Sequence, residues 1–110
     1  MTVFEKIAAG QIPAKIILDR EDFIAFHDVN PQAPVHVLIV PRKCITRLAD
    51  TDDADLLGRM LLATREIARM LGVLDSGYRV VINNGRDAGE SVPHLHIHLL
   101  AGRALKWPPG

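Results

Sequence analysis

The segment His94-Leu95-His96-Ile97-His98-Leu99-Leu100 places three of the chain's five histidines at every second position. Because neighbouring side chains of a β-strand point to opposite faces, an extended segment puts these histidines on one face and the residues between them on the other. The apolar face is expected to pack against a helix. A rise of about 3.3 Å per residue spaces successive imidazoles roughly 6.6 Å apart along the strand.

The histidine segment has three interpretations. A polar face of an edge strand is disfavoured, because threonine, lysine or glutamate would serve equally well there. Two of the strand histidines together with His36 could ligate zinc, whereas His94 and His98 lie roughly 13 Å apart, too far for one tetrahedral site. In covalent catalysis, one imidazole nitrogen attacks an electrophile while an acceptor holds the other and fixes the tautomer. The residues alone leave metal binding and covalent catalysis open.

The loop before this segment contains Gly85 and Gly89, which allow a close approach of the backbone to a ligand. Its last part, Gly89-Glu90-Ser91-Val92, presents amide groups and a hydroxyl near the first histidine. Such a turn can bind an anion through its N–H groups. Glycine-rich loops are common, but beside a row of histidines this one favours a phosphate ligand.

The rest of the chain alternates between short elements and turns. A short helix over residues Val3–Ala9 ends at Gly10, and a long helix over Asp52–Leu71 begins at Asp52 or Asp53 and ends before Gly72. The expected strands are Lys15–Asp19, Phe23–His27, Val35–Val40, Tyr78–Asn83 and His94–Leu100. Because most of these strands are joined by short connections, the pattern predicts an α+β fold with a mainly antiparallel sheet.

The long helix is apolar over more of its circumference than one sheet requires. Two apolar stripes share it, formed by Leu56, Leu57, Met60, Leu61, Leu62, Ile67, Met70 and Leu71. We expect the second stripe to meet another subunit.

Composition limits the function classes. The 110 residues carry 13 basic and 13 acidic side chains, without the basic excess that is typical of nucleic-acid binders. The single cysteine, Cys44, excludes an internal disulfide and is typical of a reducing compartment. No signal peptide and no apolar run of roughly 20 residues is present. We therefore expect one domain over residues 1–110, located in the cytoplasm, without a membrane or nucleic-acid partner.

The histidine segment resembles the signature of the histidine-triad (HIT) superfamily, in which three histidines alternate with apolar residues before two more apolar positions. The whole chain is similar to the Hint branch, the purine nucleoside phosphoramidases. The supporting segments are Phe4-Glu5-Lys6-Ile7, Ile12-Pro13-Ala14-Lys15-Ile16-Ile17, Ala25-Phe26-His27-Asp28-Val29, Pro31-Gln32-Ala33-Pro34-Val35-His36, Gly77-Tyr78-Arg79-Val80-Val81, Gly89-Glu90-Ser91-Val92 and Trp107-Pro108-Pro109-Gly110.

The resemblance implies a catalytic role for five residues. His96 would attack the α-phosphorus of a nucleotide and form a nucleotidyl-histidine intermediate, which water then hydrolyses. His98 and His36 would orient His96 and stabilise its charge. His94 and Ser91 would lie at the phosphate.

The resemblance also implies how the substrate is bound. Asn83 and the Gly89 backbone would contact the phosphate side, and Asp28 would accept hydrogen bonds from the ribose hydroxyls, as suits a carboxylate facing two adjacent hydroxyls. The base pocket would be lined by Val3, Phe4, Ile7, Phe26, His27 and Val29. Trp107, in the tail of residues 101–110, would reach towards the active site of a second subunit.

The implied protein is a homodimer in which two five-stranded sheets join into one of ten strands, and it requires no metal or other cofactor. Its implied reaction is hydrolysis of the P–N bond of purine nucleoside 5′-phosphoramidates. The alternatives are a dinucleoside polyphosphate hydrolase or nucleotidyl transferase of the same superfamily, a non-catalytic nucleotide-binding scaffold, and a zinc-dependent enzyme. Pro93 and Lys106 depart from residues common in relatives, which affects the expected substrate preference.

Overall fold

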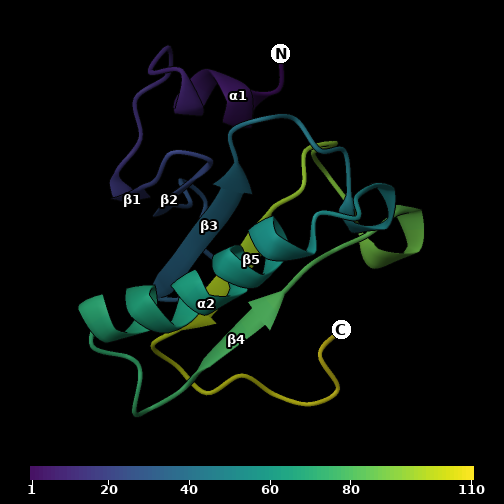
Figure 1. The fold of residues 1–110 in the computed structure, drawn as a ribbon. Coiled ribbons are helices and arrows are strands. Elements are labelled where there is room, and N and C mark those ends of the chain that lie inside the picture. Colours follow the sequence, from purple (N-terminus) through teal and green to yellow (C-terminus); the bar gives the residue numbers. More distant parts are fainter.

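The computed structural model describes all 110 residues and contains a five-stranded antiparallel sheet with one short and one long α-helix (Figure 1). The strands are β1 (Ile16–Asp19), β2 (Phe23–His27), β3 (Val35–Pro41), β4 (Tyr78–Val81) and β5 (Ile97–Ala101). They lie side by side in the order β1-β2-β3-β5-β4, so β1 and β4 form the two edges. The predicted α+β class is confirmed.

The long helix α2 (Ala54–Met70) covers one face of the sheet (Figure 1). It begins at Asp53, whose carboxylate accepts the N–H of Leu56, and Gly72 follows it with a φ of 74°. The largest buried cluster joins this helix to Leu95, Ile97 and Leu99, which confirms that the apolar side of the histidine segment packs against a helix. No helix in the structure is both long and apolar enough to cross a membrane.

The short helix α1 (Val3–Ala8) packs against a second apolar cluster. The alternation along β2 and β3 divides their side chains between two clusters, with Ala25 and Ile39 in the cluster of α2 and Phe26 and Leu38 in that of α1. Because α1 and α2 cover different sets of alternating residues, they lie on opposite faces of the sheet. The odd-numbered side of the histidine segment belongs to the α2 face, so His96 and His98 face α1.

The strand expected over His94–Leu100 is displaced, because β5 runs from Ile97 to Ala101. The N–H of His94 bonds to the carbonyl of Val92 in a tight turn, and the N–H of Leu95 bonds to the carbonyl of Ile45 in the loop after β3. Residues 94–96 therefore connect to a loop instead of a neighbouring strand. Strand β4 is also shorter than expected and ends at Val81.

Candidate active site

Two neighbouring strands bring His36 and His98 together. On β3 and β5, Leu38 is the direct partner of His98, and His36 lies two residues away on the same face. Nε2 of His36 is 2.9 Å from Nδ1 of His98. The N–H of Gln32 donates to Nδ1 of His36 at 3.0 Å, so neutral His36 carries its proton on Nε2 and donates it to His98. Neutral His98 then carries its own proton on Nε2.

His96 has its tautomer fixed by the main chain. Its Nδ1 lies 2.7 Å from the carbonyl oxygen of His94. Because a carbonyl only accepts, Nδ1 carries the proton, and in the neutral ring Nε2 then keeps an unshared electron pair. The ring also contacts Phe4 of α1 edge to face, at 5.0 Å between centroids, and its centroid is 4.9 Å from that of His98. A buried imidazole with one nitrogen anchored and one free is the arrangement that a nucleophile requires.

His94 is fully buried, with no exposed surface. Its Nε2 lies 2.8 Å from the carbonyl oxygen of Pro41, and its Nδ1 lies 2.8 Å from the hydroxyl of Thr2. Both ring nitrogens are therefore occupied, and neither is free to contact a phosphate. The bend before β5 turns the ring of His94 into the protein, so the phosphate contact expected of His94 stays a prediction that would require one of these bonds to open.

The three histidines around His96 are uncharged at neutral pH. Burial is the main cause that lowers the pKa of His98 from 6.5 to about 4; repulsion from His96 and His36 contributes, and the carboxylate of Asp28 opposes the shift. Burial also lowers the pKa of His36, although the carboxylate of Asp28 acts in the opposite direction. The pKa of His94 is lowered by burial as well, against the effect of its bond to Pro41. The network therefore donates and accepts hydrogen bonds as neutral imidazoles.

Asp28 stands between the histidines and an open hollow. One carboxylate oxygen accepts the N–H of Asn30, and the other lies 3.5 Å from Nε2 of His36. The hollow has a volume of about 680 Å³, within the range of small-ligand sites. Its lining consists of Pro13, Ala14, Lys15, His27, Asp28, Val29, Pro31, Pro34 and His36.

The residues expected to line a base pocket divide into two groups. His27 and Val29 line the hollow, and Val29 is 92% exposed. Phe4, Ile7 and Phe26 instead belong to the buried cluster beneath α1, so only a small part of each is accessible. The three apolar side chains therefore form part of the core beneath α1. The remaining expected pocket residue is Val3, which lies on the exposed side of α1.

The loop expected to bind phosphate is held by an ion pair. Gly85 and Gly89 have φ angles of 89° and 83°, which only glycine adopts without strain. The carboxylate of Glu90 accepts the N–H of Gly85 at 3.1 Å and two bonds from the guanidinium of Arg47, at 2.9 and 3.0 Å. This arrangement lowers the pKa of Glu90, chiefly through Arg47. Ser91 follows the loop and is exposed to solvent.

Asn83 and Trp107, the two other expected contacts, have different surroundings. The register of β4 and β5 pairs Val81 with His98, so Asn83, two residues further on, follows β4 on the side of His96. Asn83 is half-buried after the end of β4 and has no side-chain hydrogen bond. Trp107 is 81% exposed in the tail, where the carbonyl of Lys106 accepts a bond from Arg79 of β4 at 3.1 Å. The tail therefore runs beside the edge strand β4.

Sequence analysis overlooked four residues that hold the site together: Thr2, Gln32, Arg47 and Glu90. Thr2 and Glu5 have the spacing of a helix capping box, a signal that was present in the sequence. Nothing comparable indicates the N–H of Gln32, because a main-chain donor leaves no trace in residue type. Arg47 and Glu90 are 43 positions apart, and only the fold brings them together.

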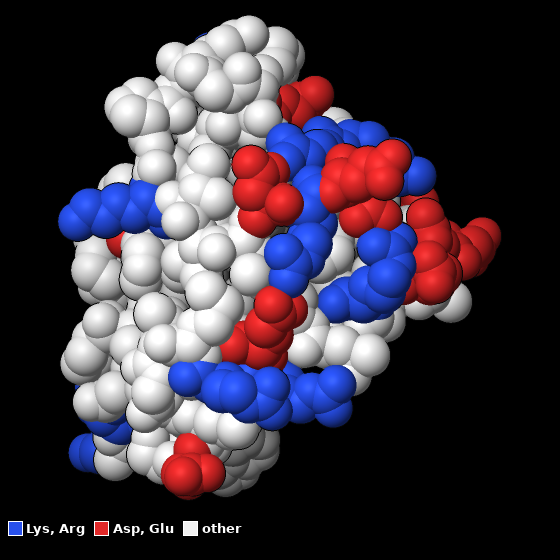
Figure 2. Space-filling model, turned by 60° about the vertical axis from the view of Figure 1, so that its left-hand side comes forward, with Lys and Arg blue, Asp and Glu red and all other residues white.

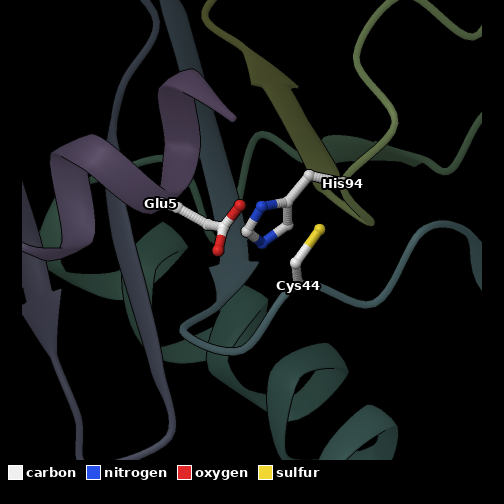
Figure 3. A group of neighbouring side chains, drawn as sticks. All are labelled: Glu5, Cys44 and His94. Atoms are coloured by element: carbon white, nitrogen blue, oxygen red, sulfur yellow. The ribbon is translucent and has the colours of Figure 1, made fainter. Parts of the chain in front are cut away.

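Two groups of side chains have ligand atoms close enough for a metal ion. Figure 3 shows the first, in which Glu5 of α1 and Cys44 of the loop after β3 flank the ring of His94. The second is Asp28, His36 and His98. In both groups the ligand atoms lie within 4.8 Å of one another, yet the ring nitrogens of His94 and the facing nitrogens of His36 and His98 are already hydrogen-bonded. A metal would have to displace these bonds.

A larger hollow of about 810 Å³ lies between the β1–β2 turn and α2, among side chains of both charges. Arg20 pairs there with Glu66 and Arg59 with Asp22, which leaves little net positive charge for an anion. Figure 2 shows one face of the molecule on which basic and acidic side chains alternate without a field of one sign. The hollow beside the histidines is therefore the better candidate for a catalytic site.

Comparison with known proteins identifies the family of this chain. Residues 9–105 match the family described as the HIT domain. The chain belongs to the HIT family. This HIT-family chain is 50% identical over 111 residues to an uncharacterized HIT-like protein from Synechocystis sp., with 99% of this chain and 96% of that protein covered.

Among solved structures, the HIT family hydrolase from Legionella pneumophila Philadelphia 1 is 41% identical to this HIT-family chain, with a TM-score of 0.96 and all of both chains covered. The histidine triad nucleotide-binding protein from Candida albicans is 32% identical, with a TM-score of 0.84, and the match covers 98% of this chain and 83% of that one. The Legionella match therefore includes the whole sheet, both helices and the histidine segment of this chain.

Proposed function

We propose that this HIT-family protein hydrolyses the P–N bond of purine nucleoside 5′-phosphoramidates, with His96 as the nucleophile. The observation that carries the proposal is the hydrogen bond from Nδ1 of His96 to the carbonyl of His94, because it leaves Nε2 unprotonated and free to attack. The names of structural neighbours support a hydrolase and a nucleotide ligand: one is a HIT family hydrolase and another a histidine triad nucleotide-binding protein.

The reaction divides into two displacements at phosphorus. In the first, Nε2 of His96 forms a bond to the α-phosphorus while the P–N bond breaks, and the nitrogen leaves with the bonding electrons and takes up a proton from solvent. In the second, water attacks the phosphorus, the bond to His96 breaks, and the surplus proton is released to solvent. The His36–His98 pair supports the positive charge that His96 carries while it is bonded to phosphorus.

The substrate is expected to lie with its sugar in the hollow and its phosphate at His96. Asp28 lines the hollow and offers the carboxylate oxygen that faces His36, which suits ribose hydroxyls. The N–H groups of the loop around Gly89, with Ser91 beside them and Asn83 at the end of β4, would supply donors to the anionic oxygens. Val29 and His27 would contact the base.

A homodimer is part of this proposal. Strand β4 is an edge strand whose outer hydrogen-bonding groups have no partner in one chain. Apolar side chains of α2 also remain exposed, among them Leu61, Leu62 and Met70. Pairing of two β4 strands would join two sheets into one of ten strands, and the tail carrying Trp107 runs beside this edge.

Hydrolysis of adenosine 5′-phosphoramidate, followed by the release of adenosine monophosphate, tests the proposal. We expect turnover in the presence of excess chelator, because no step requires a metal ion. Turnover that disappears with chelator and returns with zinc would indicate a zinc-dependent enzyme. Faster cleavage of a dinucleoside polyphosphate would indicate the other activity of the superfamily, and nucleotide binding without any hydrolysis would indicate a scaffold.

A second experiment tests the nucleophile itself. Replacement of His96 by glycine should abolish hydrolysis while nucleotide binding persists, because the substitution removes the attacking nitrogen. Added imidazole should restore part of the activity by occupying the space beside Phe4. Substantial hydrolysis by His96→Gly without imidazole, or by His96→Ala, would contradict the assignment.

A further inference from the structure

The hydroxyl of Thr2 has two partners in different parts of the fold. Its oxygen accepts the N–H of Glu5 at 3.1 Å and thereby caps α1, and the same oxygen lies 2.8 Å from Nδ1 of His94. Because Nε2 of His94 donates to the carbonyl of Pro41, Nδ1 of the neutral ring must accept. The hydroxyl proton of Thr2 is therefore directed at His94, and one side chain joins the start of α1 to the catalytic segment.

His94 transmits this contact to His96. Its carbonyl oxygen is the acceptor that holds Nδ1 of His96, and its ring is buried and bonded at both nitrogens. Phe4 of the same helix contacts both imidazoles, with centroids 5.7 Å from His94 and 5.0 Å from His96. A shift of His94 would therefore move the acceptor that fixes the tautomer and the direction of His96.

We propose that Thr2 is a positioning residue for the nucleophile: its hydroxyl clamps the His94 ring, and the His94 carbonyl in turn holds His96 with Nε2 free. The inference rests on the proposed function for the role of His96, whereas the positioning itself can be measured without turnover. Both partners of the Thr2 hydroxyl belong to the protein, so its removal should affect the chemical step more than binding.

The surroundings of His94 explain why the hydroxyl matters. Figure 3 shows the carboxylate of Glu5 and the thiol of Cys44 on either side of this ring. The carboxylate of Glu5 accepts the N–H of Thr2 at 2.9 Å and has no proton to donate, and the thiol of Cys44 donates to the carbonyl of Pro93 at 3.6 Å. Neither therefore replaces the hydroxyl as a donor to Nδ1. Without Thr2, a buried acceptor would be left unpaired, and buried polar groups in proteins are nearly always paired.

Three substitutions separate the clamp from the helix cap. Thr2→Val keeps the shape of the side chain but removes the hydroxyl, and Thr2→Ser restores a hydroxyl that can both cap and donate. Glu5→Ala disturbs the capping box at the bond to the Thr2 N–H while the hydroxyl remains opposite His94. If a weaker start of α1 alone explained the effect of Thr2→Val, Glu5→Ala should have a similar effect, because it removes the other bond of the same capping box.

The imidazole nitrogens are followed by ¹⁵N NMR, and the hydrolysis of adenosine 5′-phosphoramidate is measured on the same variants with chelator present. In Thr2→Val we expect a shifted Nδ1 signal of His94, an altered Nδ1–H signal of His96, and a kcat lowered about tenfold with KM within about twofold, because small misplacements of reacting groups slow chemistry strongly. Thr2→Ser and Glu5→Ala should keep the wild-type signals and kcat.

Unchanged imidazole signals in Thr2→Val would overturn the inference, and so would a Glu5→Ala variant that matches Thr2→Val in both readouts. If Thr2→Val does not fold, Thr2→Ala provides the same test. If the wild-type protein hydrolyses no phosphoramidate, the proposed function fails, but the ¹⁵N signal of His96 still decides whether Thr2 positions that ring.

Discussion

Nε2 of His36 donates a hydrogen bond to Nδ1 of His98 across two neighbouring strands, at a distance of 2.9 Å. The N–H of Gln32 fixes the direction of this bond, because it occupies the other nitrogen of His36. Asp28 adds a negative charge 3.5 Å from the donor nitrogen. Both imidazoles must stay neutral for this bond to keep its direction, and the ring of His98 then lies beside that of His96, at 4.9 Å between centroids.

The burial of these histidines predicts a loss of stability in acid. The folded protein holds the pKa of His98 at about 4, below the ordinary 6.5, so the unfolded chain takes up this proton first as pH falls. The contribution of His98 to the free energy of unfolding should be constant above pH 6.5 and fall between pH 6.5 and 4, by about 3 kcal/mol. His36 and His94 act in the same direction, because their pKa values are also lowered.

Urea unfolding at a series of pH values between 4 and 8 measures this effect. The variant His98→Asn should have a smaller slope, since its amide oxygen still accepts the His36 bond but has no proton to gain. A free energy of unfolding that does not change over this range, or a slope that His98→Asn leaves intact, would contradict the prediction.

Strand β2 and the long helix could be predicted because their signals are local. Phe23–His27 follows a polar turn, and Asp53 and Gly72 bound α2, so both elements appear close to where they were expected. The local structure of the histidine segment was harder to predict. Alternation placed three imidazoles in one row, but the turn at His94 and the bond from Leu95 to Ile45 depend on a loop about 50 residues away.

The supporting contacts of the site were less accessible to sequence analysis for a related reason. The carbonyls of Pro41 and His94 and the N–H of Gln32 set three histidine tautomers, and every residue type carries such main-chain groups except for the proline N–H. Their direction follows from backbone conformation, so only the fold reveals them. The resemblance to HIT proteins named the histidines without indicating these partners.

The ion pair of Glu90 and Arg47 should determine how well the glycine loop binds phosphate. Glu90→Ala removes three hydrogen bonds that hold the loop, so we expect KM to rise about tenfold, equivalent to about 1.4 kcal/mol. The matched control is Asp50→Ala, which removes an exposed bond to the same guanidinium and should change KM less than twofold, because exposed ion pairs contribute about 0–1 kcal/mol. Equal effects of the two substitutions would show that the loop needs no such anchor.

The two edges of the sheet offer a matched test of the dimer. Val80 on β4 is 36% exposed and Ile16 on β1 is 48% exposed, and each is an apolar residue on an edge strand. If two β4 strands pair, Val80→Arg should convert the protein to a monomer by placing like charges at the interface, while Ile16→Arg should not. Light scattering after size-exclusion chromatography measures the mass. A wild-type monomer, or dissociation by Ile16→Arg instead, would refute pairing through β4.

The tail should influence specificity more than stability. Trp107 is 81% exposed, and the described contact of the adjacent Lys106 is a single bond from its carbonyl to Arg79, so deletion of Trp107–Gly110 removes little buried surface. We expect the free energy of unfolding to change by less than about 0.5 kcal/mol, as for other surface changes.

If the tail of one subunit contacts the substrate bound by the other, the ratio of kcat/KM for phosphoramidates with different amine leaving groups should change. Arg79→Gln, which weakens only the tail anchor, should shift this ratio in the same direction. Identical ratios in wild type, deletion and Arg79→Gln would place the tail outside the substrate site.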